Sequence, residues 1–107
     1  MLNFLKKLFG SSSADEALDF KKILADGAVL IDVRTPKEYE SGHIDGALLF
    51  PVQTIEQNIE AIRKLNKPVI AYCRSGNRSG RATKILNNHG IKTVNGGGFT
   101  TLKEILK

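Results

Sequence analysis

The stretch that decides the fold of this chain reads Pro68-Val69-Ile70-Ala71-Tyr72-Cys73-Arg74-Ser75-Gly76-Asn77-Arg78-Ser79-Gly80-Arg81. It opens with a short apolar run after a proline, which is typical of a buried strand. The run ends at Cys73, the only cysteine among the 107 residues. A basic, polar loop follows, and a helical pattern then begins at Ser79. In such a strand–loop–helix unit, backbone N–H groups converge at the start of the helix and favour negative charge.

The loop after Cys73 is rich in groups that stabilise an anion. Its two arginines provide fixed positive charge, its glycine lets the backbone turn tightly, and its serines and asparagine offer hydrogen-bond donors. Such surroundings lower the pKa of a cysteine thiol below the ~8.5 of a free cysteine. A lone buried cysteine is often only structural, but this loop favours a reactive thiolate. We therefore predict Cys73 as the catalytic nucleophile, with a substrate site formed by Arg74, Ser75, Gly76, Asn77, Arg78 and Ser79.

The composition describes one ordinary globular domain with a basic surface. With 107 residues, 41% of them hydrophobic and 25% charged, the chain is long enough for one core and too short for two. A single cysteine and two distant histidines exclude a disulfide within the chain and give no metal centre, so we expect no bound metal. The net charge of +5 suits a small anionic substrate. Because the lysines are dispersed and no arginine-rich run occurs, we expect no binding to nucleic acid.

Apolar runs and helical patterns alternate along the chain. We expect strands near residues 28–31, 47–50, 69–72 and 91–94, helices near residues 14–25, 36–41, 55–65, 79–88 and 99–106, and a tight loop at residues 96–98. Thr35, Pro36 and Glu38 supply a capping box with a proline in the first turn of the second helix. The alternation predicts an α/β domain whose parallel sheet is covered on both faces. Ligands bind beyond the carboxyl ends of such strands, where Cys73 lies.

The N-terminal residues differ from the rest of the chain. Residues 1–10 are amphipathic, with Lys6 and Lys7 interrupting the apolar side chains, and three serines follow. The segment lacks the continuous apolar core and the cleavage site of a signal peptide, and it is too short to span a bilayer. We therefore divide the chain into an amphipathic arm and linker (residues 1–13) and one domain (residues 14–107). We expect the arm to pack on the domain or fray; the alternative is a helix that binds weakly to a membrane surface or to a partner. We expect the protein to be cytoplasmic.

Three stretches make the chain resemble a single-domain rhodanese, a sulfurtransferase. They are Val29–Arg34 together with Glu38-Tyr39 and Gly42–Ala47, then Tyr72–Ser79, and finally Val94–Gly97. The first two stretches in this order are highly specific, whereas the third is weak alone. The resemblance implies a three-layer α/β/α domain around a central parallel sheet of four to five strands.

The resemblance also implies a mechanism and its partners. The thiolate of Cys73 attacks the outer sulfur of a donor such as thiosulfate, and a persulfide forms on Cys73. The loop amides stabilise this persulfide until a thiophilic acceptor takes the sulfur. The acceptor is cyanide in an assay and a thiol or a protein in the cell. This is covalent catalysis in two steps that uses no cofactor or metal.

Several further residues in the matching stretches have expected structural roles. Asp32 and Arg34 flank a strand end, where they either form a buried pair or contact the substrate. His43 is expected to anchor its turn by hydrogen bonds and not to act in catalysis. Relatives often carry a tryptophan soon after the glycine pair, and this sequence places Phe99 there, which is expected to change the packing and not the chemistry.

Two alternative functions remain open from the sequence. Phosphatases and arsenate reductases that share this fold use a loop one residue longer, C-x5-R, which encloses a tetrahedral phosphate. The loop from Cys73 to Arg78 is C-x4-R, and this smaller ring suits a sulfur atom better. The second alternative is a sulfur carrier that binds partner proteins, holds a persulfide on Cys73 and turns over no small molecules.

Overall fold

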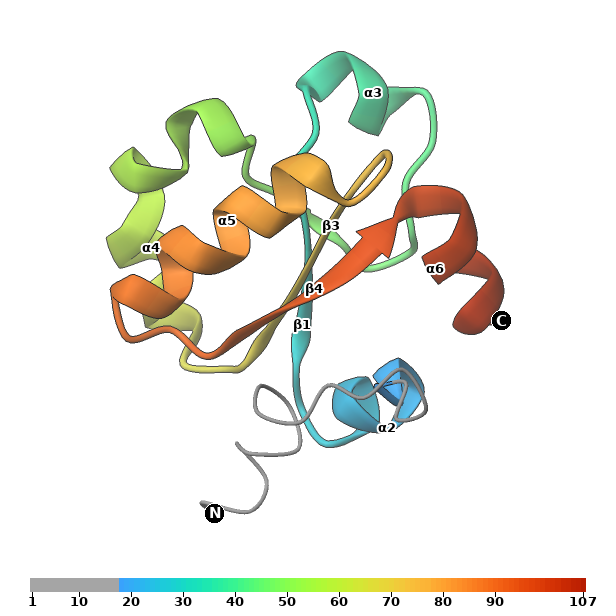
Figure 1. Ribbon diagram of the computed structural model, residues 1–107, viewed down its shortest axis with the longest axis horizontal. Coiled ribbons are helices and arrows are strands. Elements are labelled where there is room, and N and C mark those ends of the chain that lie inside the picture. Colours follow the sequence, from blue (N-terminus) through green and yellow to red (C-terminus); the bar gives the residue numbers. More distant parts are fainter. Residues whose placement is uncertain (1–17) are drawn as a thin grey trace.

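The computed structural model of the protein describes residues 18–107, which form an α/β fold (Figure 1). Its strands make one parallel four-stranded sheet in the order β2-β1-β3-β4. The elements in chain order are α2 (Phe20–Ala25), β1 (Val29–Asp32), α3 (Pro36–Glu40), β2 (Leu48–Leu49), the 3-10 helix η2 (Val52–Asn58), α4 (Ile59–Leu65), β3 (Val69–Cys73), α5 (Asn77–Asn88), β4 (Thr93–Gly98) and α6 (Phe99–Ile105).

Helices cover both faces of the sheet. Successive strand residues point to opposite faces, so the central strands β1 and β3 each contribute to two separate apolar clusters. One cluster joins the sheet to η2, α4 and α5, and it includes Ile31, Ala71, Ile55, Ile62 and Leu86. The other joins the sheet to α2 and α6, and it includes Leu30, Ile70, Ile23 and Leu102. In Figure 1 the two groups of helices lie on either side of the strands, which confirms the predicted three-layer α/β/α architecture.

Helix α3 begins as the sequence predicts. The Thr35 hydroxyl accepts a hydrogen bond from the Glu38 N–H at 3.2 Å, and the Glu38 carboxylate accepts one from the Thr35 N–H at 3.0 Å. This capping box, with Pro36 in the first turn, satisfies N–H groups that a helix start leaves without partners. The cap also holds the Glu38 carboxylate in the position from which it pairs with Arg78, beside the loop after Cys73.

Three predicted helices begin differently in the structure. Helix α5 begins at Asn77, two residues before the predicted Ser79, because Gly76 with φ of +101° takes the cap position. The helix that ends at Ala25 begins at Phe20, because Asp19 has non-helical backbone angles and its side chain caps the Lys22 N–H at 3.1 Å. The segment expected at residues 55–65 is a 3-10 helix followed by α4, with non-helical angles at Thr54. Val52 and Ile55 are both buried, and their spacing of three residues matches the 3-10 turn. The predicted arm, linker and helix start at residues 1–17 lie outside the described residues.

The glycine run near the C-terminus is part of a strand, so the predicted tight loop at residues 96–98 is wrong. Strand β4 pairs with β3 through Asn95 opposite Ala71 and Gly97 opposite Tyr72, which leaves Gly96 as an extra residue in the ladder. A Cβ atom on Gly96 would lie 2.8 Å from the Ile70 side chain. The run therefore bends the strand closely over its neighbour and carries it on toward the loop after Cys73.

Candidate active site

Cys73 lies fully buried at the carboxyl end of β3, facing the start of α5. Its Sγ accepts hydrogen bonds from the Gly76 N–H at 3.0 Å and from the Ser79 N–H at 3.4 Å. The Ser79 hydroxyl lies 3.4 Å from the same sulfur. The loop and the first turn of the helix thus surround the sulfur with donors, as the strand–loop–helix pattern predicts.

These donors control the ionisation of the thiol. Burial alone raises the pKa of the Cys73 thiol, because it disfavours the charged form. The Ser79 hydroxyl and the N–H groups of Ser79, Gly76 and Ser75 lower it, and together they outweigh burial. The pKa of Cys73 is therefore lower than that of an ordinary cysteine, which increases the share of nucleophilic thiolate near neutral pH.

Gly76 makes this geometry possible. It precedes the first residue of α5 with φ of +101°, in the left-handed region that favours glycine. A Cβ atom there would also contact the Cα of Gly97 at 3.5 Å. The turn directs the Gly76 N–H toward the sulfur, so this glycine is a specific requirement of the site.

Arg78, predicted as a substrate-binding residue, is engaged by a carboxylate. Its guanidinium donates to both oxygens of Glu38, at 2.8 Å and 3.0 Å, and both side chains are about one third exposed. The Arg78 hydrogen bonds and the Thr35 N–H lower the pKa of Glu38 to about 2. The pair joins α5 to α3 beside the loop, and it offsets part of the positive charge that the sequence offers to an anion.

The remaining loop residues lie at the surface. Arg74, Ser75 and Asn77 are exposed, and Arg74 forms no side-chain hydrogen bond or ion pair with the described residues. Their side chains are therefore accessible at the mouth of the loop. Ser79, in contrast, is fully buried beside the sulfur.

Asp32 and Arg34 form the buried pair that the sequence left as one of two possibilities. The Arg34 guanidinium donates to Asp32 at 2.6 Å and to the Gly42 carbonyl at 2.7 Å. Its Cζ lies 4.5 Å from the centre of the Phe99 ring, and that ring stacks on Tyr72. The pair thus links the end of β1 to the turn after α3 and to α6. Through Phe99 it also supports Tyr72, the residue before Cys73.

His43 stabilises the turn between α3 and β2, as predicted. Its Nδ1 lies 2.8 Å from the Tyr39 carbonyl, and its ring stacks on the Tyr39 ring with centres 3.6 Å apart. The Tyr39 hydroxyl in turn donates to the Ala47 carbonyl at 2.7 Å. These contacts hold the turn between α3 and β2.

Sequence reasoning missed Asn95 as a residue of the site. Its Oδ1 accepts from the Ser79 hydroxyl at 2.7 Å and from the Gly97 N–H at 2.9 Å, and its Nδ2 donates to the Gly76 carbonyl at 3.1 Å. Asn95 lies 22 positions after Cys73, in a stretch whose glycines drew attention first. Only the pairing of β3 with β4 brings it to the loop.

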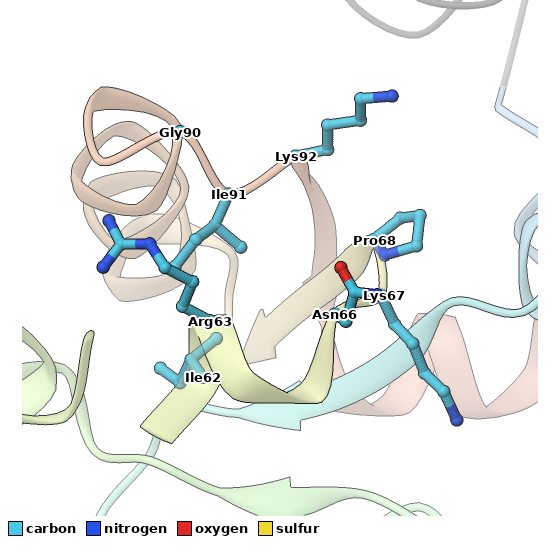
Figure 2. A pocket seen from close by; sticks show the side chains of 8 residues that line it. All are labelled: Ile62, Arg63, Asn66, Lys67, Pro68, Gly90, Ile91 and Lys92. Atoms are coloured by element: carbon cyan, nitrogen blue, oxygen red, sulfur yellow. The ribbon is translucent and has the colours of Figure 1, made fainter. Parts of the chain in front are cut away.

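A pocket lies at the end of the sheet opposite Cys73 (Figure 2). This pocket of about 250 Å³ is formed where α4 and α5 end, and Arg63, Lys67 and Lys92 are among its lining residues. Arg63 already donates to the His89 carbonyl at 2.8 Å and pairs with Glu60, and the Lys67 and Lys92 side chains point away from one another. Cations at helix C-termini are explained by the helix dipole. The loop around Cys73 therefore remains the candidate site.

One structural finding concerns membranes. Within residues 18–107, no helix has both the length and the apolar character needed to cross a bilayer. The expected cytoplasmic location stays a prediction.

Comparisons with known proteins agree with this architecture. Residues 16–103 match the family described as Rhodanese-like domain. The chain is 45% identical over 67 residues to the Bacillus subtilis protein YqhL, an alignment that covers 63% of this chain and only 52% of that protein. It is 39% identical over 71 residues to the Escherichia coli thiosulfate sulfurtransferase PspE, covering 64% of this chain and 68% of PspE.

A solved structure shows the same likeness. The human single-domain sulfurtransferase TSTD1 matches with a TM-score of 0.64 and 28% identity, over 80% of this chain and 90% of the human chain. The match to the family extends over most of the sequence and includes β1, the Cys73 loop and β4. The chain therefore belongs to the rhodanese-like domain family.

Proposed function

We propose that this protein is a sulfurtransferase that carries sulfane sulfur as a persulfide on Cys73. The observation that carries the proposal is the set of donors around Cys73 Sγ, with N–H groups at 3.0 Å and 3.4 Å and a hydroxyl at 3.4 Å. Such a set stabilises negative charge on a sulfur without a histidine base. The similarity to the E. coli thiosulfate sulfurtransferase supports the same chemistry.

The first half-reaction loads the cysteine. The Cys73 thiolate attacks the outer sulfur of thiosulfate and forms a new S–S bond. The S–S bond of thiosulfate breaks, and sulfite leaves with the bonding electron pair. The exposed Arg74 and Asn77 at the mouth of the loop supply positive charge and a hydrogen-bond donor for the anionic donor.

The second half-reaction transfers the outer sulfur from Cys73 to an acceptor. A thiophilic acceptor, such as cyanide, a thiol or a protein thiol, attacks the outer sulfur of the persulfide. The S–S bond breaks, and its electron pair returns to Cys73 as the thiolate that the loop stabilises. Every atom and charge is conserved over the two steps, and the residues of the chain act by positioning and by electrostatic stabilisation.

The test is thiocyanate formation from thiosulfate and cyanide, with the wild type and Cys73→Ser measured side by side. We expect turnover by the wild type and none above the uncatalysed background for the variant. Turnover of an aryl phosphate that depends on Cys73 would instead support the phosphatase alternative. Persulfide formation without thiocyanate turnover would identify a carrier and overturn the catalytic part of the proposal.

A further inference from the structure

The Ser79 hydroxyl lies between two hydrogen-bond acceptors. Its Oγ is 2.7 Å from Asn95 Oδ1 and 3.4 Å from Cys73 Sγ. A hydroxyl has one hydrogen to donate, so it donates fully to only one of the two at a time. The shorter distance favours Asn95 while the sulfur is uncharged, whereas a thiolate is the stronger acceptor of a charge-assisted hydrogen bond.

The orientation of the Asn95 side chain is fixed by its neighbours. The Gly97 N–H donates to Oδ1 at 2.9 Å, and Nδ2 donates to the Gly76 carbonyl at 3.1 Å. A flipped amide would place donor against donor at Gly97 and acceptor against acceptor at Gly76. The oxygen therefore faces Ser79, and Asn95 presents it with an acceptor.

We propose that Asn95 is a positioning residue that holds the Ser79 hydroxyl hydrogen while Cys73 Sγ is uncharged and releases it when that sulfur becomes a thiolate. This inference rests on the proposed sulfur transfer for its place in the reaction. In the free enzyme the Sγ thiolate takes the hydrogen bond from Ser79. When the persulfide forms, the negative charge moves to the outer sulfur, and the Ser79 hydroxyl returns to Asn95. The buried hydroxyl thus has an acceptor in both states, which avoids the cost of an unsatisfied buried donor.

The proposal predicts in which direction the pKa of Cys73 changes when the Asn95 amide is removed. With Asn95 present, forming the thiolate breaks the Ser79–Asn95 hydrogen bond. Without that acceptor, nothing is lost when the Ser79 hydroxyl turns to the sulfur. Removing the Asn95 amide should therefore lower the pKa of Cys73. The expected shift is about half a unit to one unit, because forming the thiolate no longer breaks one neutral hydrogen bond.

The charged groups near the thiol are unaffected by this change. They are the exposed Arg74 of the loop, Arg78 of α5 with its partner Glu38 of α3, and the buried Asp32 and Arg34 at the end of β1. Asn95 hydrogen-bonds to none of these five side chains; its partners are Ser79, Gly76 and Gly97. The η2 and α5 side chains in the apolar cluster around Cys73 carry no charge, and neither does Ser79 of α5.

The experiment measures the rate of alkylation of Cys73 by iodoacetamide, a neutral reagent, as a function of pH. The proteins are the wild type, Asn95→Ala, Ser79→Ala and the double variant, with Asn88→Ala as an exposed asparagine control on α5. We expect Asn95→Ala to lower the pKa of Cys73, Ser79→Ala to raise it, and Asn88→Ala to leave it unchanged. In the Ser79→Ala background, the Asn95 substitution should have no further effect on the pKa.

Two results would overturn the inference. One is an unchanged or raised pKa in Asn95→Ala, and the other is an equal shift with and without the Ser79 hydroxyl. Thermal unfolding of each variant establishes that it is folded. The alkylation profile requires no sulfur donor, so it tests Asn95 even if the protein transfers no sulfur. Persulfide formation measured separately tests the proposed function.

Discussion

At the scale of single residues, the reactivity of Cys73 is a balance between burial and hydrogen bonds. Burial raises the pKa of the thiol, and the donors of Ser79, Gly76 and Ser75 lower it by more. None of these donors carries a formal charge. The site therefore depends on backbone geometry, and small changes in the loop should change its chemistry.

Gly76→Ala should affect both stability and chemistry. Alanine at φ of +101° costs about 1 kcal/mol, and any relief of that strain moves the N–H that faces the sulfur. We expect a free energy of unfolding lower by about that amount and a raised pKa of Cys73 in the alkylation profile. Gly90→Ala is the matched control, because Gly90 has φ of +80° and open space at the far end of α5. Gly90→Ala should lose similar stability with no change in the pKa of Cys73. A changed pKa in both variants would contradict the explanation that the Gly76 N–H beside the sulfur sets this pKa.

Glu38 makes stability depend on pH. Its pKa of about 2 in the folded protein lies below its ordinary value of 4.5, so the ionised carboxylate stabilises the fold above pH 4.5. This stabilisation is lost as the pH falls from 4.5 toward about 2. Glu38→Gln keeps an oxygen that can cap α3 but loses the charge that holds Arg78. We expect denaturant unfolding to show a loss of about 1 to 2 kcal/mol near neutral pH that shrinks below pH 4.5. A difference independent of pH would contradict this role of the charge.

At the scale of elements, β4 is the part that completes the site. Its glycine run lets the backbone pass over β3 and over the Cys73 loop, because a Cβ atom on Gly98 would lie 2.6 Å from the Arg74 carbonyl oxygen. The same strand brings Asn95 to Ser79. The loop is therefore held from two sides, by α5 on one side and by β4 on the other.

Gly98→Ala should push the loop and the strand apart. Because the clash is with backbone and not with a flexible side chain, we expect a loss of about 1 to 3 kcal/mol in the free energy of unfolding. The rate of Cys73 alkylation should change as well, since the Arg74 carbonyl belongs to the loop. Thr100→Ala, at an exposed position of α6, should leave both quantities within error. If Gly98→Ala changed neither the free energy of unfolding nor the rate of Cys73 alkylation, this close approach would be unimportant.

Local patterns predicted the elements but not how they meet. The capping box of α3 and the apolar run of β3 depend on neighbours in sequence, so they could be recognised there. The extra residue at Gly96 depends on Ile70 of β3, which lies far away along the chain. The pairing of Arg78 with Glu38 and the role of Asn95 arise in the same way. Cys73 and its loop were predictable because they form one continuous segment.

At the scale of the whole molecule, one buried ion pair links several parts of the fold. The Asp32 and Arg34 side chains are 0% and 5% exposed, and they join the end of β1 to the turn at Gly42 and to Phe99 of α6. Arg34→Met leaves the Asp32 charge buried without its partner, so we expect a loss of about 3 to 5 kcal/mol on unfolding in denaturant. Lys22→Met, which breaks the exposed pair with Asp26, should cost less than about 1 kcal/mol. Equal losses would show that burial of the pair is irrelevant.

The most direct test of the proposed chemistry is an intact-mass spectrum recorded without reductant. Wild type and Cys73→Ser are each measured before thiosulfate, after thiosulfate and again after cyanide. We predict that the wild type gains the mass of one sulfur atom and loses it with cyanide, whereas the variant gains nothing. An added sulfur that persists in Cys73→Ser, or a wild type that accepts none from thiosulfate or from a desulfurase, would contradict a persulfide on Cys73.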